Sequence, residues 1–182
     1  MTIEKPVFKF ALREDIKDDK RFLPTRAHST DSGWDVRAAQ EDRKPLIVKP
    51  FEYVKVPLGF RSFCPDGWWY ELKPRSSTFA KKHLHTLYGT VDFSFEGSLI
   101  LSAQYIPPLR LGQLATYKGE EAFAFDKSGM QTLTIEFGDA IGQLIPVKRK
   151  EMEVVDIGNE EYDRLCKERG GLRGSGGFGS TG

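Results

Sequence analysis

The amino-acid sequence predicts an all-β fold for this chain of 182 residues. Its 18 glycines and 10 prolines divide the chain into short segments. Between these breaks lie many runs rich in valine, isoleucine, phenylalanine and tyrosine, residues that favour strands. The one longer helical pattern covers residues 160–169, where apolar side chains recur at helical spacing. The length suits one domain with a substantial core.

Composition excludes several classes of protein. Lysine and arginine total 27 and aspartate and glutamate total 26, so the chain lacks the general basic surface that attracts nucleic acid. Apolar runs are too short to span a membrane. The first residues are charged and are interrupted by Pro6, which is not the pattern of a signal peptide. With only two cysteines, Cys64 and Cys166, we expect reduced thiols and a cytoplasmic location.

Alternation of apolar and polar residues, together with the turn residues between runs, places the expected strands. The predicted strands cover residues 6–12, 34–38, 46–56 with a break at Pro50, 58–63, 68–72, 99–105, 131–137 and 140–147. About one helical turn is expected at 79–83. Residues 107–129 have no regular pattern and several turn signals, so we expect a surface excursion there.

The chain is organised around residues 88–100, where β-formers on both sides of small residues predict a β-hairpin. Asp92 lies inside this stretch, between Val91 and Phe93. A carboxylate with such neighbours is poorly solvated by them and needs a reason to be there. Two interpretations are open: a turn aspartate that bonds its own backbone, or a general base that activates water.

Other polar residues offer similar alternatives. Asp35 projects from the strand at 34–38, either as an exposed charge or as a partner of a hard cation. Gln143 interrupts a buried strand, either as a satisfied core amide or as a group that orients water around a metal. Arg75, Ser76 and Ser77 follow a proline, either as an ordinary helix start or as a phosphate cradle.

The last ten residues, 173–182, contain five glycines, two serines and one threonine, which cannot build a core. Such a stretch is commonly a flexible linker. However, Arg173 can pair with a terminal phosphate and Phe178 can stack on a base, while Ser180 and Thr181 offer hydroxyl groups to an anion. These residues favour a mobile lid over a nucleotide.

The order of these motifs resembles the trimeric all-β dUTP pyrophosphatases (dUTPases) over nearly the whole chain. The five stretches that carry the resemblance are residues 27–38, 74–77, 89–97, 138–144 and 173–182. It implies a β-clip, jelly-roll-like barrel with one short helix. The chain would then comprise one domain, 1–172, with an inserted excursion at 107–129, and a C-terminal lid, 173–182.

The resemblance also implies a role for each motif residue. Asp92 matches the base that activates water for attack on the α-phosphorus of dUTP, which gives dUMP and pyrophosphate. Asp35 and Gln143 match groups that hold Mg²⁺ through water, the ion being bound mainly by the triphosphate. A homotrimer with shared sites is implied. The residues that match substrate contacts are Arg75, Ser76, Ser77, Gly89, Phe95, Ile100, Gln143, Arg173, Phe178, Gly179, Ser180 and Thr181.

Three features depart from the family pattern. Phe95 stands where tyrosine is usual, and Ala140 stands where the fourth motif usually carries arginine, a charge that Arg110 or Lys148 could replace. The excursion at 107–129 is longer than the usual connection and is a candidate surface for a protein partner. Two other functions stay open at this point: a related dCTP deaminase, and a nucleotide-controlled interaction protein on the same fold.

Overall fold

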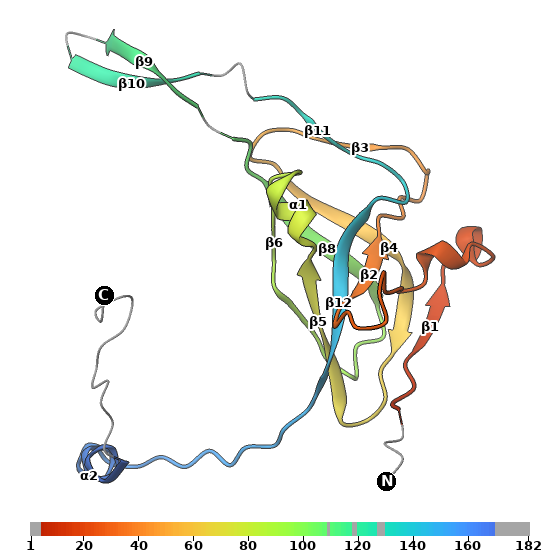
Figure 1. Ribbon diagram of the computed structural model, residues 1–182, viewed down its shortest axis with the longest axis vertical. Helices are drawn as coiled ribbons and strands as arrows, with labels where there is room; N and C mark the ends of the chain where they lie inside the picture. The colour runs from red at the N-terminus through yellow and green to blue at the C-terminus, as the bar shows by residue number, and fades with distance from the viewer. Residues whose placement is uncertain (1–4, 109, 118–119, 127–129, 170–182) are drawn as a thin grey trace. The chain divides into compact units, whose positions relative to one another are not determined.

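The structure, a computed structural model, describes residues 5–108, 110–117, 120–126 and 130–169 (Figure 1). The chain divides into two compact units, Met1–Arg149 and Lys150–Gly182. The first unit contains two antiparallel sheets of four strands each, and no described helix in it is longer than five residues. The predicted all-β class is therefore confirmed.

The first sheet has the strand order β1-β4-β8-β6 and the second the order β2-β12-β5-β7. In the first sheet the strands are β1 (Lys9–Leu12), β4 (Tyr53–Phe63), β8 (Ser98–Tyr105) and β6 (Leu84–Thr86). In the second they are β2 (Trp34–Arg37), β12 (Ala140–Lys148), β5 (Trp68–Pro74) and β7 (Gly89–Val91). All pairings within both sheets are antiparallel.

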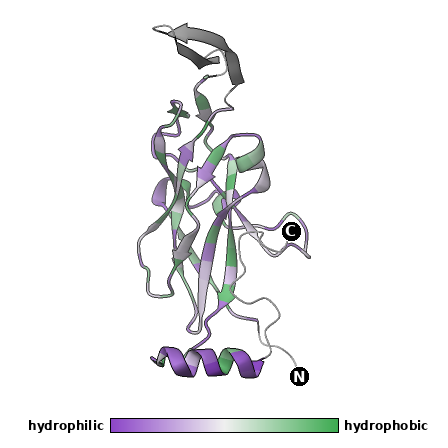
Figure 2. Cartoon of the chain, turned by 90° about the vertical axis from the view of Figure 1, so that its left-hand side faces the viewer, coloured by the Kyte–Doolittle hydropathy of each residue, from purple (hydrophilic) through white to green (hydrophobic). Residues whose placement is uncertain are grey.

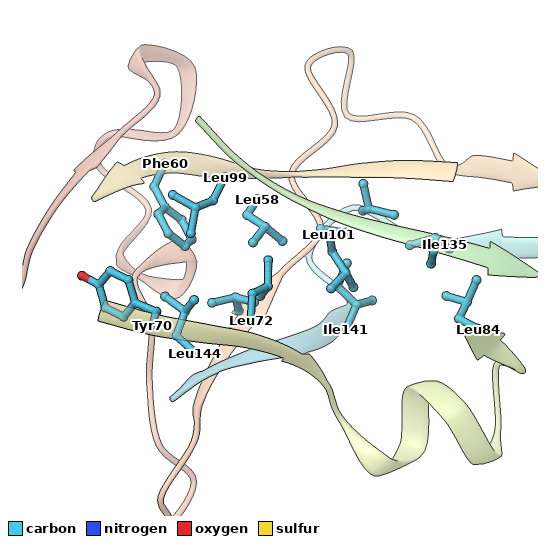
Figure 3. Packing of buried hydrophobic residues seen from close by; sticks show 14 of the residues in the cluster. Leu58, Phe60, Tyr70, Leu72, Leu84, Leu99, Leu101, Ile135, Ile141 and Leu144 are labelled. Carbon is cyan, nitrogen blue, oxygen red and sulfur yellow. The ribbon is translucent and has the colours of Figure 1, made fainter. Parts of the chain in front are cut away.

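The hydrophobic core lies between the two sheets (Figure 3). Because successive side chains of a strand point to opposite faces, alternate residues of each strand enter the core and the others face outward. The first sheet contributes Leu58, Phe60, Leu99 and Leu101 to the core, and the second contributes Tyr70, Leu72, Ile141 and Leu144. Packing of two such inner faces is the arrangement of a β-sandwich.

Smaller elements complete the first unit. β3 (Leu46–Val48) pairs with β11 (Leu133–Ile135), and β9 (Arg110–Tyr117) pairs with β10 (Glu120–Asp126). Two 3-10 turns, η1 (Glu14–Ile16) and η2 (Lys20–Phe22), follow β1, and α1 (Ser76–Ala80) follows β5. The α1 turn begins three residues earlier than the predicted turn at 79–83.

Three predicted segments differ from the structure. A break was expected between 46–56 and 58–63, but β4 runs without interruption through Pro57 and Gly59. The chain leaves the strand conformation earlier, between β3 and β4. Gly59 permits this with a φ of +73°, in a place where a Cβ would lie 2.6 Å from the side chains of Ala39 and Ile16. β11 covers only the middle of the predicted strand 131–137. The excursion, expected to be irregular, contains the regular strands β9 and β10.

The cysteines and the C-terminal helix follow the sequence predictions. Both Cys64 and Cys166 are free thiols, and burial raises the pKa of the Cys64 thiol, which favours its protonated form. The cytoplasmic location stays a prediction. In the second unit, α2 (Asn159–Arg169) forms where helical spacing indicated it; none of its residues is buried, and it is mostly hydrophilic in Figure 2. Among the described residues, no helix is long and apolar enough to cross a membrane.

Candidate active site

Strand β12 brings three sequence motifs together, because it lies between β2 and β5. In the antiparallel register, Gln143 of β12 stands opposite Asp35 of β2 on one side and Lys73 of β5 on the other. β5 then ends at Pro74, and Arg75 leads into α1. The backbone N–H of Arg75 donates to the Ile141 carbonyl at 3.4 Å, so the start of α1 is also tied to β12.

The central electrostatic contact of this region is an ion pair between Arg75 and Asp35. The Nε atom of Arg75 lies 3.0 Å from Oδ1 of Asp35, with side chains that are 36% and 20% exposed. The pair is thus partly shielded from water. In a shielded place a charge without a partner is unfavourable. Asp35 is therefore no solitary exposed strand charge, which was one of the two interpretations of the sequence.

Gln143 is held by its neighbours in one orientation. Its Nε2 donates to the Pro74 carbonyl at 3.1 Å. Its Oε1 lies against Gly33, where an added Cβ would stand only 2.0 Å away. The amide nitrogen is thus used by the protein, and its oxygen occupies the space that the missing side chain of Gly33 leaves.

A pocket of about 450 Å³ opens beside these groups. We call it the polar pocket; its lining residues are Ala27, Asp31, Ser32, Gly33, Asp35, Arg75, Ser76, Gln143 and Ile145. Hydroxyl, carboxylate, amide and guanidinium groups converge in it, which is a set suited to a charged, oxygen-rich ligand. The predicted residues Asp35, Arg75, Ser76 and Gln143 are brought together here, whereas Ser77 does not line the pocket.

The polar pocket fits a magnesium ion only in one way. No cluster of three or more histidine, cysteine, aspartate or glutamate residues that could hold a metal occurs among the residues that the structure describes. Mg²⁺ requires oxygen ligands in octahedral geometry and readily keeps several of its waters. The carboxylate of Asp35 and the amide oxygen of Gln143 are suitable acceptors for such waters. The donor set therefore fits an ion that arrives with an anionic ligand.

A second pocket, of about 200 Å³, lies between β7 and β8. We call it the apolar pocket; its lining residues are Leu72, Thr90, Val91, Phe95, Ser98, Leu99 and Ile100. The predicted hairpin at 88–100 is wrong, because β7 pairs with β5 in one sheet while β8 pairs with β4 and β6 in the other. The sheets separate here, so the connection crosses between them and leaves the pocket open.

The strands β7 and β8, which line the apolar pocket, have edges without a strand partner in the described part of the chain. β7 is the last strand of its sheet, so in the described part of the chain one of its edges has no strand partner. β8 pairs with β6 only from Ala103 to Tyr105, and its edge at Ile100 is without a partner among the described strands. Backbone N–H and C=O groups on such edges are available to a ligand.

The turn that carries Asp92 is shaped by its own backbone and by a glycine. The N–H of Phe95 donates to the Asp92 carbonyl at 3.0 Å. The Phe95 ring lies over Gly97, where a Cβ would stand 2.6 Å from the ring. Arg149, at the end of the first unit, lies 5.4 Å from the centre of the Phe93 ring.

The environment predicted for Asp92 is not found in the single chain. Its side chain was expected among poorly solvating neighbours, but the residue is exposed. Phe93 and Phe95 are themselves 45% and 44% exposed. Both rings thus leave nearly half of their surface open to solvent, so the sequence pattern describes a local composition and not a buried environment.

The structure thus distributes the predicted residues over two pockets. Phe95 and Ile100 line the apolar pocket, and Gly89 begins β7 at its border. No described residue lines both pockets. The predicted contacts in the tail, Arg173, Phe178, Gly179, Ser180 and Thr181, lie outside the described residues.

Sequence reasoning missed several neighbours of these sites. Asp31 and Gly33 line the polar pocket beside Gln143. The sequence carries no signal for them, because their importance depends on where Gln143 lies in the fold. Arg37 stands opposite Ala140 in the register and donates through Nη1 to the Gly138 carbonyl at 2.9 Å. Arg37 thus places a guanidinium beside the position where the family arginine is absent.

Of the two residues suggested for that charge, the structure places only the side chain of Lys148. Lys148 ends β12, eight residues beyond Ala140, which is about 26 Å along an extended strand. Within one chain it therefore cannot supply a charge at Ala140, and this part of the suggestion is wrong. The side chain of Arg110 lies outside the described part of the molecule.

Comparison with known proteins agrees with this architecture. No family model matches the chain. The chain is 35% identical to the deoxyuridine 5′-triphosphate nucleotidohydrolase of Aquifex aeolicus over 134 residues, 71% of this chain and 73% of that protein. It is 30% identical to the enzyme of the same name from Caulobacter vibrioides over 164 residues, 88% of this chain and 86% of that protein.

Solved structures share the fold. The dUTPase of Staphylococcus bacteriophage 80alpha with dUPNHPP superposes with a TM-score of 0.68 at 24% identity, covering 98% of this chain and 99% of that one. The dUTPase from phage phi11 of S. aureus, noted for a species-specific insert, superposes with a TM-score of 0.62 at 22% identity, covering 83% of this chain and 96% of that one. The first unit is a β-sandwich with a polar and an apolar pocket. The chain belongs to the dUTPase family.

Proposed function

We propose that this protein hydrolyses dUTP to dUMP and pyrophosphate. The observation that carries the proposal is the convergence of Asp35, Arg75, Ser76 and Gln143 on one pocket, in a chain whose relatives are deoxyuridine 5′-triphosphate nucleotidohydrolases. A polar pocket of this kind suits a polyphosphate, and a separate apolar pocket suits a planar base and its sugar.

The apolar pocket would hold the uracil and deoxyribose. Uracil carries alternating donors and acceptors on its edge, and the unpaired backbone groups of β7 and β8 can bond such an edge as a neighbouring strand would. Gly89 and Ile100 lie at these edges. The narrow space would exclude a 5-methyl group and so reject dTTP. The Phe95 ring would lie beneath the sugar and select against the ribose hydroxyl by its bulk.

The polar pocket would hold the phosphates. Arg75 offers a guanidinium fork to phosphate oxygens, and Ser76 adds a hydroxyl donor. Ser77, which does not line the pocket, stays a predicted phosphate contact. These donors stabilise the negative charge that moves onto the leaving pyrophosphate. Asp35 and Gln143 would hold Mg²⁺ through its waters, and the ion, when bound, neutralises charge on the triphosphate. Neither residue needs to contact the reacting phosphorus.

Asp92 would act as the general base. A carboxylate beside the α-phosphate can take a proton from water as the water attacks the phosphorus in line with the leaving pyrophosphate. In one chain Asp92 is exposed and does not line the polar pocket. We therefore propose that the site is completed in a homotrimer, in which the turn of one subunit meets the polar pocket of another.

The tail would close the assembled site. Arg173, Ser180 and Thr181 supply donors for the terminal phosphate, Phe178 stacks on the base, and the backbone at Gly179 can approach the ligand closely. Residues 173–182 would thus form a lid separate from a domain of residues 1–172, and its closure would exclude water. The excursion at 107–129 stays a predicted surface for a protein partner.

A parallel assay of dUTP, dCTP, dTTP and UTP tests the proposed function. We expect pyrophosphate release from dUTP alone, at a rate that rises with added Mg²⁺. A dCTP deaminase would instead release ammonia from dCTP, and a protein that only binds nucleotide would turn over none of them. Either of these results would contradict the proposal.

A further inference from the structure

The Asp35–Arg75 ion pair occupies two of the three charged residues among the described lining of the polar pocket, the third being Asp31. The pair lies within one chain, at 3.0 Å, and both residues line the pocket. The contact joins Nε of Arg75 to Oδ1 of Asp35. A phosphate that accepts from this Nε must therefore displace Asp35. Equally, a hydrated cation whose water donates to this Oδ1 competes with Arg75 for the oxygen.

Exchange of partners requires little movement, because the backbone at both positions is fixed. Asp35 exchanges two backbone hydrogen bonds with Thr25, at 2.6 and 3.1 Å. Next to Arg75, the Pro74 carbonyl accepts from Gln143 at 3.1 Å, and the N–H of Arg75 itself donates to Ile141. Only side-chain rotation separates the paired arrangement from one in which both groups face a ligand.

Charge balance makes either ligand alone unfavourable. If a polyphosphate takes Arg75 without a cation, the carboxylate of Asp35, only 20% exposed, is left unpaired beside an anion. If a cation takes Asp35 without a phosphate, the guanidinium of Arg75 is left beside a cation. When both arrive together, each charge regains a partner of opposite sign.

We propose that the Asp35–Arg75 pair is a charge-exchange switch that makes the binding of Mg²⁺ and of the nucleotide's phosphates cooperative. This inference rests on the proposed function, since it takes a nucleotide triphosphate as the ligand. Asp35 is then more than a contact for the waters of the ion, because it also restrains Arg75 until the ion is present. Protein coupling of this kind typically changes affinity about 5- to 150-fold.

The test measures binding and needs no turnover. The affinity of the full chain for an analogue of dUTP with a non-hydrolysable imido group between the α- and β-phosphates is measured by calorimetry, with a chelator and with excess Mg²⁺. Wild type is compared with Asp35→Asn and with Asp31→Asn. Mg²⁺ also binds the analogue in solution, but that contribution is the same for all three proteins and cancels in the comparison.

Asp31 is the matched control. It lines the same pocket, and its Oδ2 accepts from the His28 N–H at 2.8 Å, a bond that an asparagine oxygen can also accept. Asp31→Asn therefore removes one negative charge from the pocket without releasing Arg75. Thermal unfolding of each variant shows whether the fold is kept; we expect it to be, because β2, β12 and β5 are joined by their own ladders.

We expect Mg²⁺ to raise wild-type affinity at least about tenfold, within the usual range of coupling. Asp35→Asn should bind the analogue several-fold more tightly than wild type in chelator, since Arg75 is released, and should gain less than about threefold from Mg²⁺. Asp31→Asn should keep the wild-type response to Mg²⁺. In a crystal structure of the complex, Asp35 and Arg75 should no longer be paired.

Other results would overturn the inference. If Asp35→Asn loses its response to Mg²⁺ without binding more tightly in chelator, Asp35 only contacts the ion and does not restrain Arg75. If Asp31→Asn changes the response as much as Asp35→Asn, the effect is one of pocket charge. An ion pair that persists in the complex would also refute the switch. If folded wild type does not bind the analogue at all, the proposed function itself fails.

Discussion

The polar and apolar pockets present different kinds of chemical group to a ligand. The polar pocket uses side chains: an arginine, a carboxylate and an amide, held by an ion pair at 3.0 Å and a hydrogen bond at 3.1 Å. The apolar pocket uses the backbone, through strand edges that have no partner in the described part of the chain. Charged side chains can change partners, whereas a strand edge offers a fixed pattern of donors and acceptors.

This difference suggests that the two pockets suit different parts of a nucleotide. A base must be distinguished from others that differ by one methyl or one amino group, which a rigid edge can do. The charge on the phosphates changes during the reaction. Charged side chains that can change partners can stay bound through this change. In the proposed function the two tasks fall to different pockets of one chain, so one nucleotide can occupy both only where a polar pocket and an apolar pocket meet.

The largest effects should come from the groups proposed to act on the reacting phosphate. Asp92→Asn removes the general base, and Arg75→Ala removes the cationic fork from the polar pocket. Each should lower kcat by at least about a hundredfold, the usual scale for such groups. Steady-state assay of dUTP hydrolysis measures this, with circular dichroism to confirm folding. Near-normal turnover in Asp92→Asn would remove Asp92 from the mechanism.

Mixing the same two variants tests whether the pockets of different subunits meet. In a trimer assembled at random from equal amounts of each, about a quarter of the sites would combine an intact Asp92 from one subunit with an intact Arg75 from another. Activity after joint unfolding and refolding should then far exceed that of either variant. No recovery, with mixed trimers confirmed by native mass spectrometry, would place Asp92 and Arg75 of one chain in the same site.

The sequence predicted the strands better than their pairing. Alternation and turn residues indicated most strands of both sheets, because these signals are local. The stretch at 88–100 was wrong for a physical reason: a turn between two β-forming runs is the same in sequence whether the runs pair with each other or with different sheets. The pairing is decided by other strands: β7 pairs with β5, and β8 pairs with β4.

The polar side chains of the site could be predicted from the sequence, but the contacts that hold them in place could not. Asp35, Arg75 and Gln143 are polar groups in or beside predicted strands, which a sequence makes visible. The ion pair of Asp35 with Arg75 joins residues 40 positions apart, and the contact of Gln143 with Gly33 joins residues 110 positions apart. Such contacts depend on the register of β12 with its neighbours, which the pattern of one chain does not contain.

A methyl group at Gly33 should disturb the polar pocket alone. In Gly33→Ala the new Cβ would meet Oε1 of Gln143 at 2.0 Å, so the amide must leave its place. We expect KM for dUTP in the presence of Mg²⁺ to rise about tenfold, on the scale of overpacking a tight contact. The matched control is Gly158→Ala, where nothing lies within 4 Å. Equal KM values for the two variants would show that the position of Gln143 is unimportant.

The corresponding change in the apolar pocket is Gly97→Ala. The added Cβ would stand 2.6 Å from the Phe95 ring, which must turn away and reshape the surface beneath the sugar. Affinity for deoxyuridine monophosphate should fall about threefold, or ~0.7 kcal/mol, while affinity for pyrophosphate stays unchanged. Calorimetry with the two products separates these effects. Weaker binding of pyrophosphate instead would show that the two pockets are not independent.

The smallest effect should follow removal of the β9–β10 hairpin, which joins neither four-stranded sheet. β9 and β10 pair only with each other among the described strands. The chain on either side is already held together, since the Tyr105 hydroxyl donates to the Gln131 carbonyl at 3.0 Å. A short glycine-containing turn in place of residues 109–129 can therefore close without moving β8 or β11.

We expect this deletion to leave kcat and KM for dUTP within about twofold of wild type and to change the free energy of unfolding by no more than about 0.5 kcal/mol, as is usual for surface changes. Kinetics, thermal unfolding and native mass spectrometry measure the three relevant properties: turnover, stability and assembly. A more than tenfold loss of turnover in a folded trimer would mean that the hairpin completes a site. A monomeric product would mean that it joins subunits, and the meeting of the two pockets would then depend on it.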